Sequence, residues 1–446
     1  MKYIVLILYT LVLTACGGGG GGSTSTAITT PSAPVSSLFQ VSTYQNADLT
    51  NQIFNTAVAD LNGDGLEDVV VSGWANEPAS YTNAIHGKVP VRILLQQTDG
   101  TLKDQTDSLL GVGNNMIYGS QRIIIADFDG DGKLDIFLGG FQDSPALSHA
   151  LSANTTTSVM FWNNGATFAR YDFPDLVWAH AVCIGNINGT GLPSIVMGAQ
   201  SGFSSNIYIN NGSRNFTWTH TAQWIASGGQ CSVIRDNNTG HVAIISGETD
   251  YNQLAGYDGV IQVFDSNLNF ISIAGLPGSE DPNNYNPHVH DIVNIINMDL
   301  NNDGLMDLVL TDNNTGNHNG SFTALINQGN FVFVNQTSTY FPTQTNNYYF
   351  QYYTHGLNIN GNSAIFVDNV DSNWNFGTLP DLWVLSNGSF QPGMQTQLSL
   401  DIGSYVQPTL YKDSGGNLHL MLIQNNNNLF TFYTKPLWCN YHPDVN

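Results

Sequence analysis

Three short acidic segments have the residue types and the spacing of a binding site for a hard cation. The first is DLNGDGLED, which begins at Asp60. In each segment oxygen-bearing side chains stand at positions 1, 3, 5 and 9, a glycine stands at position 6, and residue 7 offers its backbone carbonyl. Ca²⁺ takes about six to eight oxygen ligands, and a tight loop supplies them from alternate residues. The candidate ligands are Asp60, Asn62, Asp64, Leu66 and Asp68; Asp127, Asp129, Asp131, Lys133 and Asp135; and Asp299, Asn301, Asp303, Leu305 and Asp307.

Two other interpretations of these segments are weaker. A helix-loop-helix calcium sensor needs a bidentate Glu at position 12 and helices on both sides. Position 12 is Val71, Leu138 or Leu310, within runs of β-branched residues and leucine, so flanking strands are favoured. A solvated turn without a metal explains one such loop, because Asp, Asn and Gly favour turns. Three loops in one register, whose ten carboxylates would repel one another, predict three calcium sites of mainly structural role.

A further segment of this kind has lost its carboxylates. It carries Asn186, Asn188, Thr190 and Ser194 at the ligand positions, so strong binding is not expected there.

The acidic segments belong to a unit that recurs along the chain, an apolar run followed by a loop and a second apolar run. Besides the first, clear copies begin at Ile123 and Ile295, and weaker ones at Val182, Ser232, Ala364 and Pro408. Most are followed by a pattern such as SVMFWNNGATFARY, in which a turn dipeptide between alternating apolar residues predicts a hairpin. Four strands in each of seven units predict an all-β fold, a seven-bladed β-propeller of four-stranded antiparallel blades.

The last two units are incomplete. In the sixth, the acidic loop is interrupted between Asp368 and Asp381, and the hairpin that follows is indistinct. The seventh ends in LFTFYT, which begins at Leu429. We expect the segment SSLFQVSTYQ near Ser36 to supply its missing outer strand, so that the two ends of the chain close the ring.

The amino-terminal residues have the pattern of an export signal. Residues 1–16 combine one Lys, an apolar run shorter than a membrane span and the ending Leu-Thr-Ala-Cys. This ending resembles the lipobox of bacterial lipoproteins, which implies cleavage before Cys16 and its lipidation. Gly17 follows where lipoproteins kept in the inner membrane usually have Asp, so the outer membrane is favoured. Residues 17–36 form a flexible Gly, Ser, Thr and Pro tether, and 37–446 are the propeller.

Three cysteines remain after this processing, so one at least is unpaired. Cys183 and Cys231 fall at similar points of neighbouring units, which is compatible with a disulfide outside the cytoplasm. Buried thiols are the alternative, because similar positions do not establish the short Cα separation that a disulfide needs.

The repeated strand, DxDxDG loop and strand resemble the FG-GAP or VCBS-type repeats of bacterial surface proteins and of the integrin α-subunit head. The resemblance covers nearly everything after residue 36. It implies a seven-bladed propeller with calcium loops on the lower face and a ligand-binding upper face built from the connections between blades. These connections are rich in aromatic residues that are suited to stack on sugars or to anchor a protein. Packing of these side chains over the edges of the blades is the alternative. The candidate ligand face is Trp178, Trp224, Tyr285, Tyr348, Tyr349, Tyr352 and Tyr353.

The charge restricts the class of partner. The chain has 11 basic and 34 acidic residues and a formal net charge of -23, which argues against nucleic acid. We therefore expect a lipid-anchored, calcium-stabilised module that binds a protein or glycan at the cell envelope, periplasmic or surface-exposed, without catalysis. A polysaccharide lyase or hydrolase built on the propeller and a structural scaffold of an envelope complex are the alternatives, since a fold alone does not fix chemistry.

Overall fold

In the computed structural model of the chain, all described strands belong to one compact unit, Leu38–Asn446. The structure describes residues 40–45, 52–75, 89–117, 119–140, 157–176, 179–199, 206–219, 230–247, 259–277, 291–314, 319–344, 354–359, 362–367, 381–392, 406–416, 418–426 and 429–436. The predicted signal peptide, Cys16 and the predicted tether lie outside these residues.

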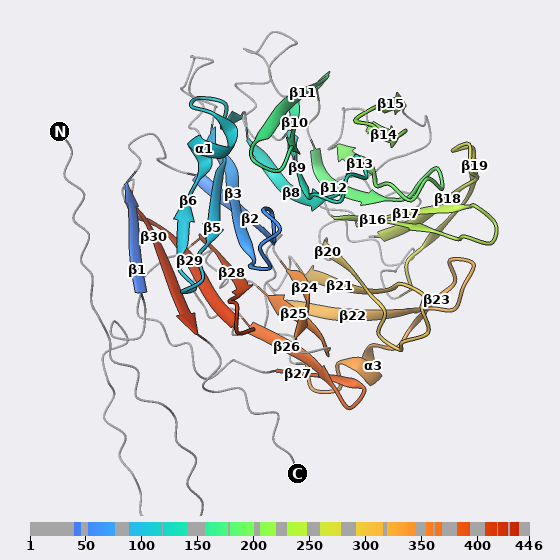
Figure 1. The fold of residues 1–446 in the computed structure, drawn as a ribbon. Coiled ribbons are helices and arrows are strands. Elements are labelled where there is room, and N and C mark those ends of the chain that lie inside the picture. The colour runs from blue at the N-terminus through green and yellow to red at the C-terminus, as the bar shows by residue number, and fades with distance from the viewer. Residues whose placement is uncertain are drawn as a thin grey trace, which may run out of the picture. The chain divides into compact units, whose positions relative to one another are not determined.

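The strands pair into antiparallel sheets of four, and Figure 1 shows these sheets arranged radially. The first three sheets are β2 (Gln52–Ala59), β3 (Asp68–Ala75), β5 (Arg92–Gln96) and β6 (Leu102–Asp104); β8 (Ser120–Ala126), β9 (Asp135–Gly140), β10 (Thr157–Asn163) and β11 (Phe168–Leu176); and β12 (Ala179–Gly185), β13 (Ser194–Ala199), β14 (Asn206–Asn210) and β15 (Phe216–Thr219). The next two are β16 (Cys231–Arg235), β17 (Val242–Gly247), β18 (Gly259–Phe264) and β19 (Phe270–Gly275); and β20 (Asp291–Met298), β21 (Asp307–Asn314), β22 (Asn319–Asn327) and β23 (Phe333–Asn335). The last two are β24 (His355–Ile359), β25 (Asn362–Val367), β26 (Asp381–Ser386) and β27 (Ser389–Pro392); and β28 (Val406–Lys412), β29 (Leu418–Asn426), β30 (Leu429–Pro436) and β1 (Gln40–Gln45).

The short elements lie at the margins of these sheets. A two-stranded ladder joins β4 (Val89–Pro90) to β7 (Met116–Ile117), and the described helices are α1 (Thr106–Leu110) and α3 (Thr337–Tyr340). Neither helix is long and apolar enough to cross a membrane.

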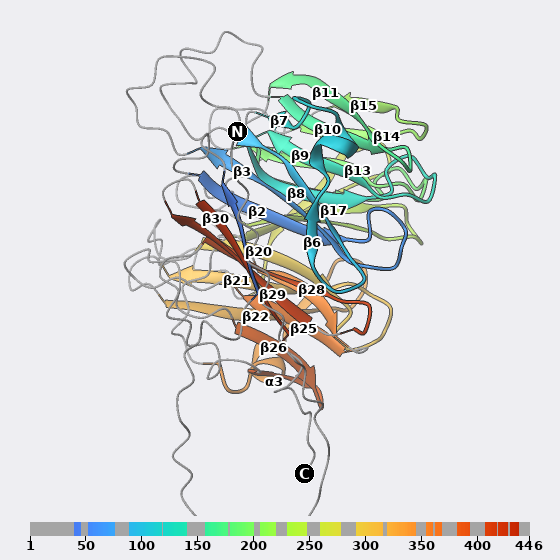
Figure 2. The same ribbon diagram turned by 60° about the vertical axis from the view of Figure 1, so that its left-hand side comes forward.

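The first strands of neighbouring sheets contact one another near the centre of the radial arrangement (Figure 1). Figure 2 shows the same sheets after a turn of 60° about the vertical axis. Contacts join β28 to β2, β2 to β8, β8 to β12, β12 to β16, β16 to β20 and β20 to β24. The expected β-propeller of four-stranded antiparallel blades is thus confirmed. The number of blades in the closed ring stays a prediction.

The core fills the spaces between neighbouring sheets. In β9 every residue is buried, and successive side chains point to opposite faces, as in any strand. Phe137 belongs to the same apolar cluster as Val182 of the third sheet, whereas Leu138 belongs to the same cluster as Val70 of the first. Burial on both faces explains why the middle strands are continuous apolar runs without a polar alternation. The outermost strand β19 is largely exposed.

The two ends of the described chain meet in one sheet. Strand β1 pairs antiparallel with β30, and Gln40 lies opposite Thr434 and Gln45 opposite Leu429. The prediction that a segment near Ser36 supplies the outer strand of the last sheet is confirmed.

The prediction for the sixth copy of the repeat is wrong by one strand. Residues 362–367 form β25, the second strand of their sheet, and Asp381–Ser386 form β26, the third. The segment between Asp368 and Asp381 therefore joins the second and third strands and is not the expected first loop. A pattern of two apolar runs around a polar segment does not by itself show whether the runs are the first and second or the second and third strands of a sheet.

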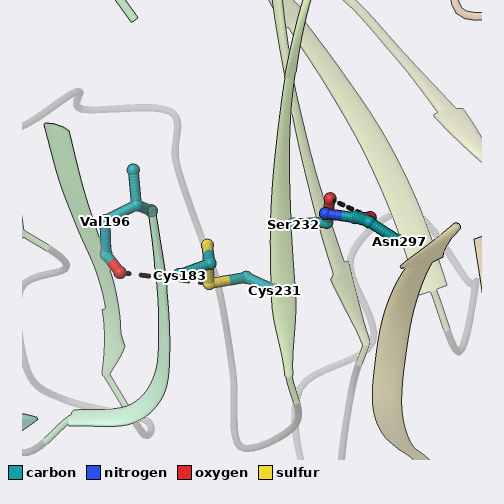
Figure 3. Close-up of a disulfide and its surroundings, with 5 residues drawn as sticks. All are labelled: Cys183, Val196, Cys231, Ser232 and Asn297. Carbon is teal, nitrogen blue, oxygen red and sulfur yellow. Dashed lines mark hydrogen bonds between the residues drawn. A yellow bond between two sulfur atoms is a disulfide. The ribbon is translucent and has the colours of Figure 1, made fainter. Parts of the chain in front are cut away.

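A disulfide joins the inner strands of two neighbouring sheets. Cys183 of β12 and Cys231 of β16 are bonded, with their Cα atoms 5.5 Å apart (Figure 3). That separation is ordinary for a disulfide. Of the two alternatives left open by the sequence, the structure therefore has the bond and not the pair of buried thiols.

Candidate metal centres

Each acidic loop connects the first strand of a sheet to the second. Residues Asp60–Asp68 join β2 to β3, Asp127–Asp135 join β8 to β9, and Asp299–Asp307 join β20 to β21. Strands on both sides exclude the helix-loop-helix interpretation. Because all three loops follow the first strand of their sheets, they lie at corresponding edges.

The carboxylate at position 1 organises the turn from inside. In the first loop Asp60 Oδ1 accepts hydrogen bonds from the amides of Gly63 at 2.8 Å and Asp64 at 3.1 Å, and Oδ2 accepts one from Gly65 at 2.8 Å. Gly63 and Gly65 have φ of +75° and +84°, and a methyl group added at either Cα would have no other atom within 4 Å. Left-handed backbone, and not lack of space, is what favours glycine there.

The side chain at position 3 differs between the loops. In the first, Asn62 accepts the amide of Asp64 at 2.9 Å and donates its own Nδ2 to Asp64 Oδ2 at 3.0 Å. Asn301 and Asp303 repeat this arrangement in the third acidic loop. In the second loop position 3 is Asp129, whose carboxylate side chain has no N–H to donate to position 5.

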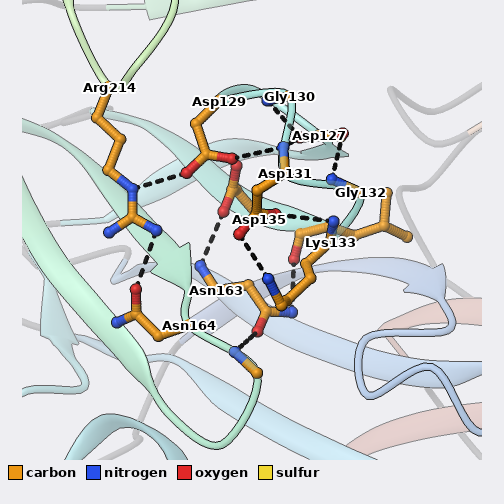
Figure 4. Close-up of polar contacts among 12 residues, drawn as sticks. Asp127, Asp129, Gly130, Asp131, Gly132, Lys133, Asp135, Asn163, Asn164 and Arg214 are labelled. Carbon is orange, nitrogen blue, oxygen red and sulfur yellow. Dashed lines mark hydrogen bonds and ion pairs between the residues drawn. The ribbon is translucent and has the colours of Figure 1, made fainter.

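Arg214, from the turn between β14 and β15, supplies a donor to that second loop (Figure 4). Its Nε lies 2.7 Å from Asp129 Oδ2. Lys133 Nζ lies 2.6 Å from Asp131 Oδ2, so two cations already pair with this loop.

The carboxylate at position 9 lies at the bottom of each loop and is fully buried. Asp135 Oδ2 accepts the amide of Phe128 at 3.0 Å, and its Oδ1 accepts the amide of Asn163, in the third strand, at 2.8 Å. Asp68 and Asp307 make the same pair of bonds in their loops. Position 9 thus ties the loop to the third strand of its own sheet, which its spacing alone did not indicate.

Burial makes these position 9 carboxylates hard to ionise. It raises the pKa of Asp68 and of Asp135 to about 6, although the two amide N–H groups pull the pKa downward. Burial also raises the pKa of Asp307. A nearby cation would favour the charged form.

The donor set fits a hard divalent cation. Asp127, Asp129 and Asp135 each bring one carboxylate oxygen to within 4.8 Å of the other two. Position 7, at Leu66, Lys133 and Leu305, donates its amide to the position 5 carboxylate. The fifteen residues predicted as ligands are therefore grouped in three loops, and their metal ligation stays a prediction.

The neutral loop of the third sheet adopts a similar turn without carboxylates. Asn186 Oδ1 accepts the amide of Gly191 at 3.2 Å, and Ser194 Oγ accepts the amide of Asn210 at 3.0 Å. Side-chain to backbone hydrogen bonds are thus the local contacts that hold this turn.

An amide side chain at the end of the third strand connects neighbouring sheets, a feature that the sequence interpretation missed. Asn163 Nδ2 donates to Leu61 O of the preceding sheet at 2.8 Å and to Leu134 O of its own sheet at 3.1 Å. Asn210 and Gln96 bond in the same way to Phe128 O and Lys412 O of the preceding sheets. For the two asparagines the signal was the Asn-x-Gly turn, because the Asn side chain also accepts the amide of the glycine two residues later. Gln96 has no such turn after it.

The candidate ligand face lies outside the described residues. Trp178, Trp224, Tyr285, Tyr348, Tyr349, Tyr352 and Tyr353 all belong to segments that join the last element of one sheet to the first strand of the next. In an antiparallel four-stranded sheet those strand ends lie at the edge opposite the loop between strands one and two.

A comparison with protein families identifies the repeat in one part of the chain. Residues 60–138, which include the first two acidic loops, match the model of the FG-GAP-like repeat. No curated protein matches the sequence. A crystal structure of BBS1N in complex with ARL6DN is similar at a TM-score of 0.41 and 10% identity over 90% of this chain and 98% of that one.

Two solved enzymes have a similar arrangement of strands. Trypanosoma rangeli sialidase in complex with 2,3-difluorosialic acid has a TM-score of 0.39 and 11% identity over 77% of this chain and 57% of that one. An ancestral GH74 enzyme has a TM-score of 0.33 and 11% identity over 88% of this chain and 57% of that one. Likenesses this distant carry no argument about activity.

Proposed function

We propose, from the premise that this chain is a β-propeller of FG-GAP-like repeats, that it is a calcium-stabilised binding module of the bacterial cell envelope. The observation that carries the proposal is that the acidic loops and the strand ends next to the aromatic segments lie at opposite edges of the sheets. One edge has the acidic loops with their inward-facing carboxylates. The opposite edge has the strand ends from which the aromatic connecting segments start.

Calcium is the expected ion because the loops offer oxygen donors alone, which suits a hard cation. Asp60, Asp127 and Asp299, with the other candidate ligands of their loops, would hold it. A bound ion would supply positive charge next to the buried position 9 carboxylates. It would thereby favour their ionised form and reinforce the connection between the first three strands of a sheet.

The ring is proposed to close with seven blades. The described residues form seven four-stranded sheets, and β1 completes the last of them by pairing with β30. First strands contact one another at the successive junctions from β28 through β2 to β24. An experimental structure in which the sheets containing β24 and β28 do not pack together would contradict this count.

A protein or glycan is the proposed ligand of the aromatic segments. Tyr and Trp faces stack on sugars and anchor protein partners through large apolar area with a polar tip. A glycan array probed with the full-length protein, with and without calcium, tests the glycan branch. Crosslinking in the native envelope tests the protein branch, and one dominant stoichiometric partner would favour a scaffold.

Catalysis is the outcome that would overturn a pure binding role. The same glycans are incubated with the protein and assayed for new reducing ends and for unsaturated sugars. The account predicts neither product. Calcium-dependent release of either would identify a polysaccharide hydrolase or lyase instead.

Lipid attachment is proposed at Cys16. Substituting Cys16→Ser is expected to abolish labelling by a fatty acid and to block cleavage before residue 16. Cys439→Ser is the matched control and is expected to change neither. Fatty-acid labelling that persists in the Cys16→Ser protein would contradict the anchor.

A further inference from the structure

We infer that Arg214 is a built-in counter-ion of the second acidic loop, which competes with the divalent cation for Asp129 and makes this site weaker than those of the other two loops. The inference rests on the proposed calcium sites and goes beyond them. It assigns the three loops unequal affinities and links the second one to the contact between two sheets.

Arg214 is held in place on three sides. Its Nε bonds to Asp129 Oδ2 at 2.7 Å, one terminal nitrogen donates to Asn164 Oδ1 at 2.9 Å, and its guanidinium carbon lies 5.2 Å from the centre of the Trp162 ring. Figure 4 shows the side chain reaching from its own turn toward the loop. The Asp129 side chain is only 8% exposed, so this is a partly desolvated ion pair, which solvent screens less than a surface pair.

Both oxygens of Asp129 are already engaged. Oδ1 accepts the amide of Asp131 at 3.1 Å, and Oδ2 accepts Arg214. A calcium ion that takes the outer oxygen of Asp129 must therefore displace the guanidinium or share the carboxylate with it.

The charges of the loops differ accordingly. The second loop has four carboxylates, and its pairs with Lys133 and Arg214 leave a formal charge of -2. The candidate ligands of the first and third acidic loops include three carboxylates each, a formal charge of -3, and an Asn at position 3 that bonds within the loop. Glu67, at position 8 of the first loop, accepts the amide of Lys412 and adds one further negative charge there. Calcium affinity of such loops depends on the number of charged ligands. The second loop should therefore bind calcium more weakly while Arg214 stays paired.

The pair also connects two sheets. Arg214 belongs to the third sheet, whereas Asp129, Asn164 and Trp162 belong to the second. A calcium ion that displaces the guanidinium would break this connection between the two sheets. Because the second site is the weaker one, this would happen at calcium concentrations at which the other two sites are already filled.

Calorimetric calcium titration of the chelator-treated full-length protein tests the inference. The wild type is expected to show two tighter sites and one weaker site. Arg214→Gln removes the positive charge and keeps a long polar side chain. It is expected to strengthen calcium binding at the weaker site by about tenfold or more, because it removes one positive charge that pairs with a ligand carboxylate. Arg214→Lys retains the charge and is expected to keep the weaker site. Arg170→Gln, which breaks an ion pair with Asp172 away from the acidic loops, is the matched control and should leave all sites unchanged.

Three equal sites in the wild type, or an unchanged or weakened site in Arg214→Gln, would overturn the inference and leave the proposed calcium loops intact. Absence of calcium binding in every variant would overturn both. Thermal unfolding in chelator verifies that each variant is folded before titration.

Discussion

The side-chain amide of Asn163 lies 2.8 Å from the backbone carbonyl of Leu61, across the boundary between the second and first sheets. The two residues are 102 positions apart in the chain. The bond places a hydrogen-bond donor from a turn of one sheet against the acidic loop of its neighbour. Propeller sheets in this chain are therefore joined by polar contacts as well as by their apolar faces.

Replacing Asn163 by alanine should destabilise the protein. The change removes the donor to Leu61 O and Leu134 O, and we expect the free energy of unfolding to fall by about 1–3 kcal/mol. Chemical denaturation measures it. The control is Asn211→Ala, at an exposed Asn in the turn between β14 and β15. It removes a side-chain hydrogen bond to Thr217 of the same sheet and should lower the free energy of unfolding by less than about 0.5 kcal/mol. Equal losses in the two variants would argue against the contact between sheets.

The disulfide should contribute a large part of the stability. Cys183 and Cys231 are 48 residues apart, and closing a loop of that length in the unfolded chain is worth roughly 4 kcal/mol in the chain-entropy model. We expect Cys183→Ser, Cys231→Ser and the double variant to lose similar amounts. A thiol assay of the denatured protein should find two more thiols after reduction than before. An unchanged thiol count would contradict the bond.

Stability without metal should rise as the pH falls from about 6 toward 4. The folded-state pKa of Asp68 and Asp135 is about 6, above the ordinary value of 3.8, so between these values the folded state binds more protons than the unfolded state. Unfolding free energy then decreases with rising pH, by up to about 3 kcal/mol for each group.

Thermal unfolding in chelator at pH 4.5 to 7 measures this effect. Asp135→Ser, which copies Ser194 of the neutral loop, should reduce the dependence. With calcium bound the dependence should reverse, because protons then compete with the ion. A chelated protein that becomes less stable throughout acidification would show that these carboxylates are not the dominant titrating groups.

The parts of the fold that depend on local patterns were predictable. The position 1 carboxylate bonds to amides within five residues, and glycines with left-handed backbone stand beside it, so nine residues of sequence define the loop. The Asn-Gly hairpin turns and the buried apolar strands are local in the same sense. Even the pairing of β1 with β30 followed from counting strands.

The features that the sequence did not reveal depend on distant residues. Arg214 reaches Asp129 over 85 positions, and its role depends on which turn packs beside which loop. Cys183 and Cys231 have similar positions in their units, but only the adjacency of β12 and β16 shows that they meet. The misplaced sixth loop has the same origin, because a second and a third strand resemble a first and a second in sequence.

The thermal unfolding temperature of the full-length protein, with chelator and with millimolar calcium, tests the central claim most directly. Calcium ions that bind the loops of the folded protein but not the unfolded chain should raise the free energy of unfolding by about 2.7 kcal/mol per site when free calcium is about 100 times the dissociation constant. We predict a clear rise in the unfolding temperature with calcium and a smaller one with magnesium, which favours a stricter geometry. An unfolding temperature that calcium leaves unchanged would contradict the account.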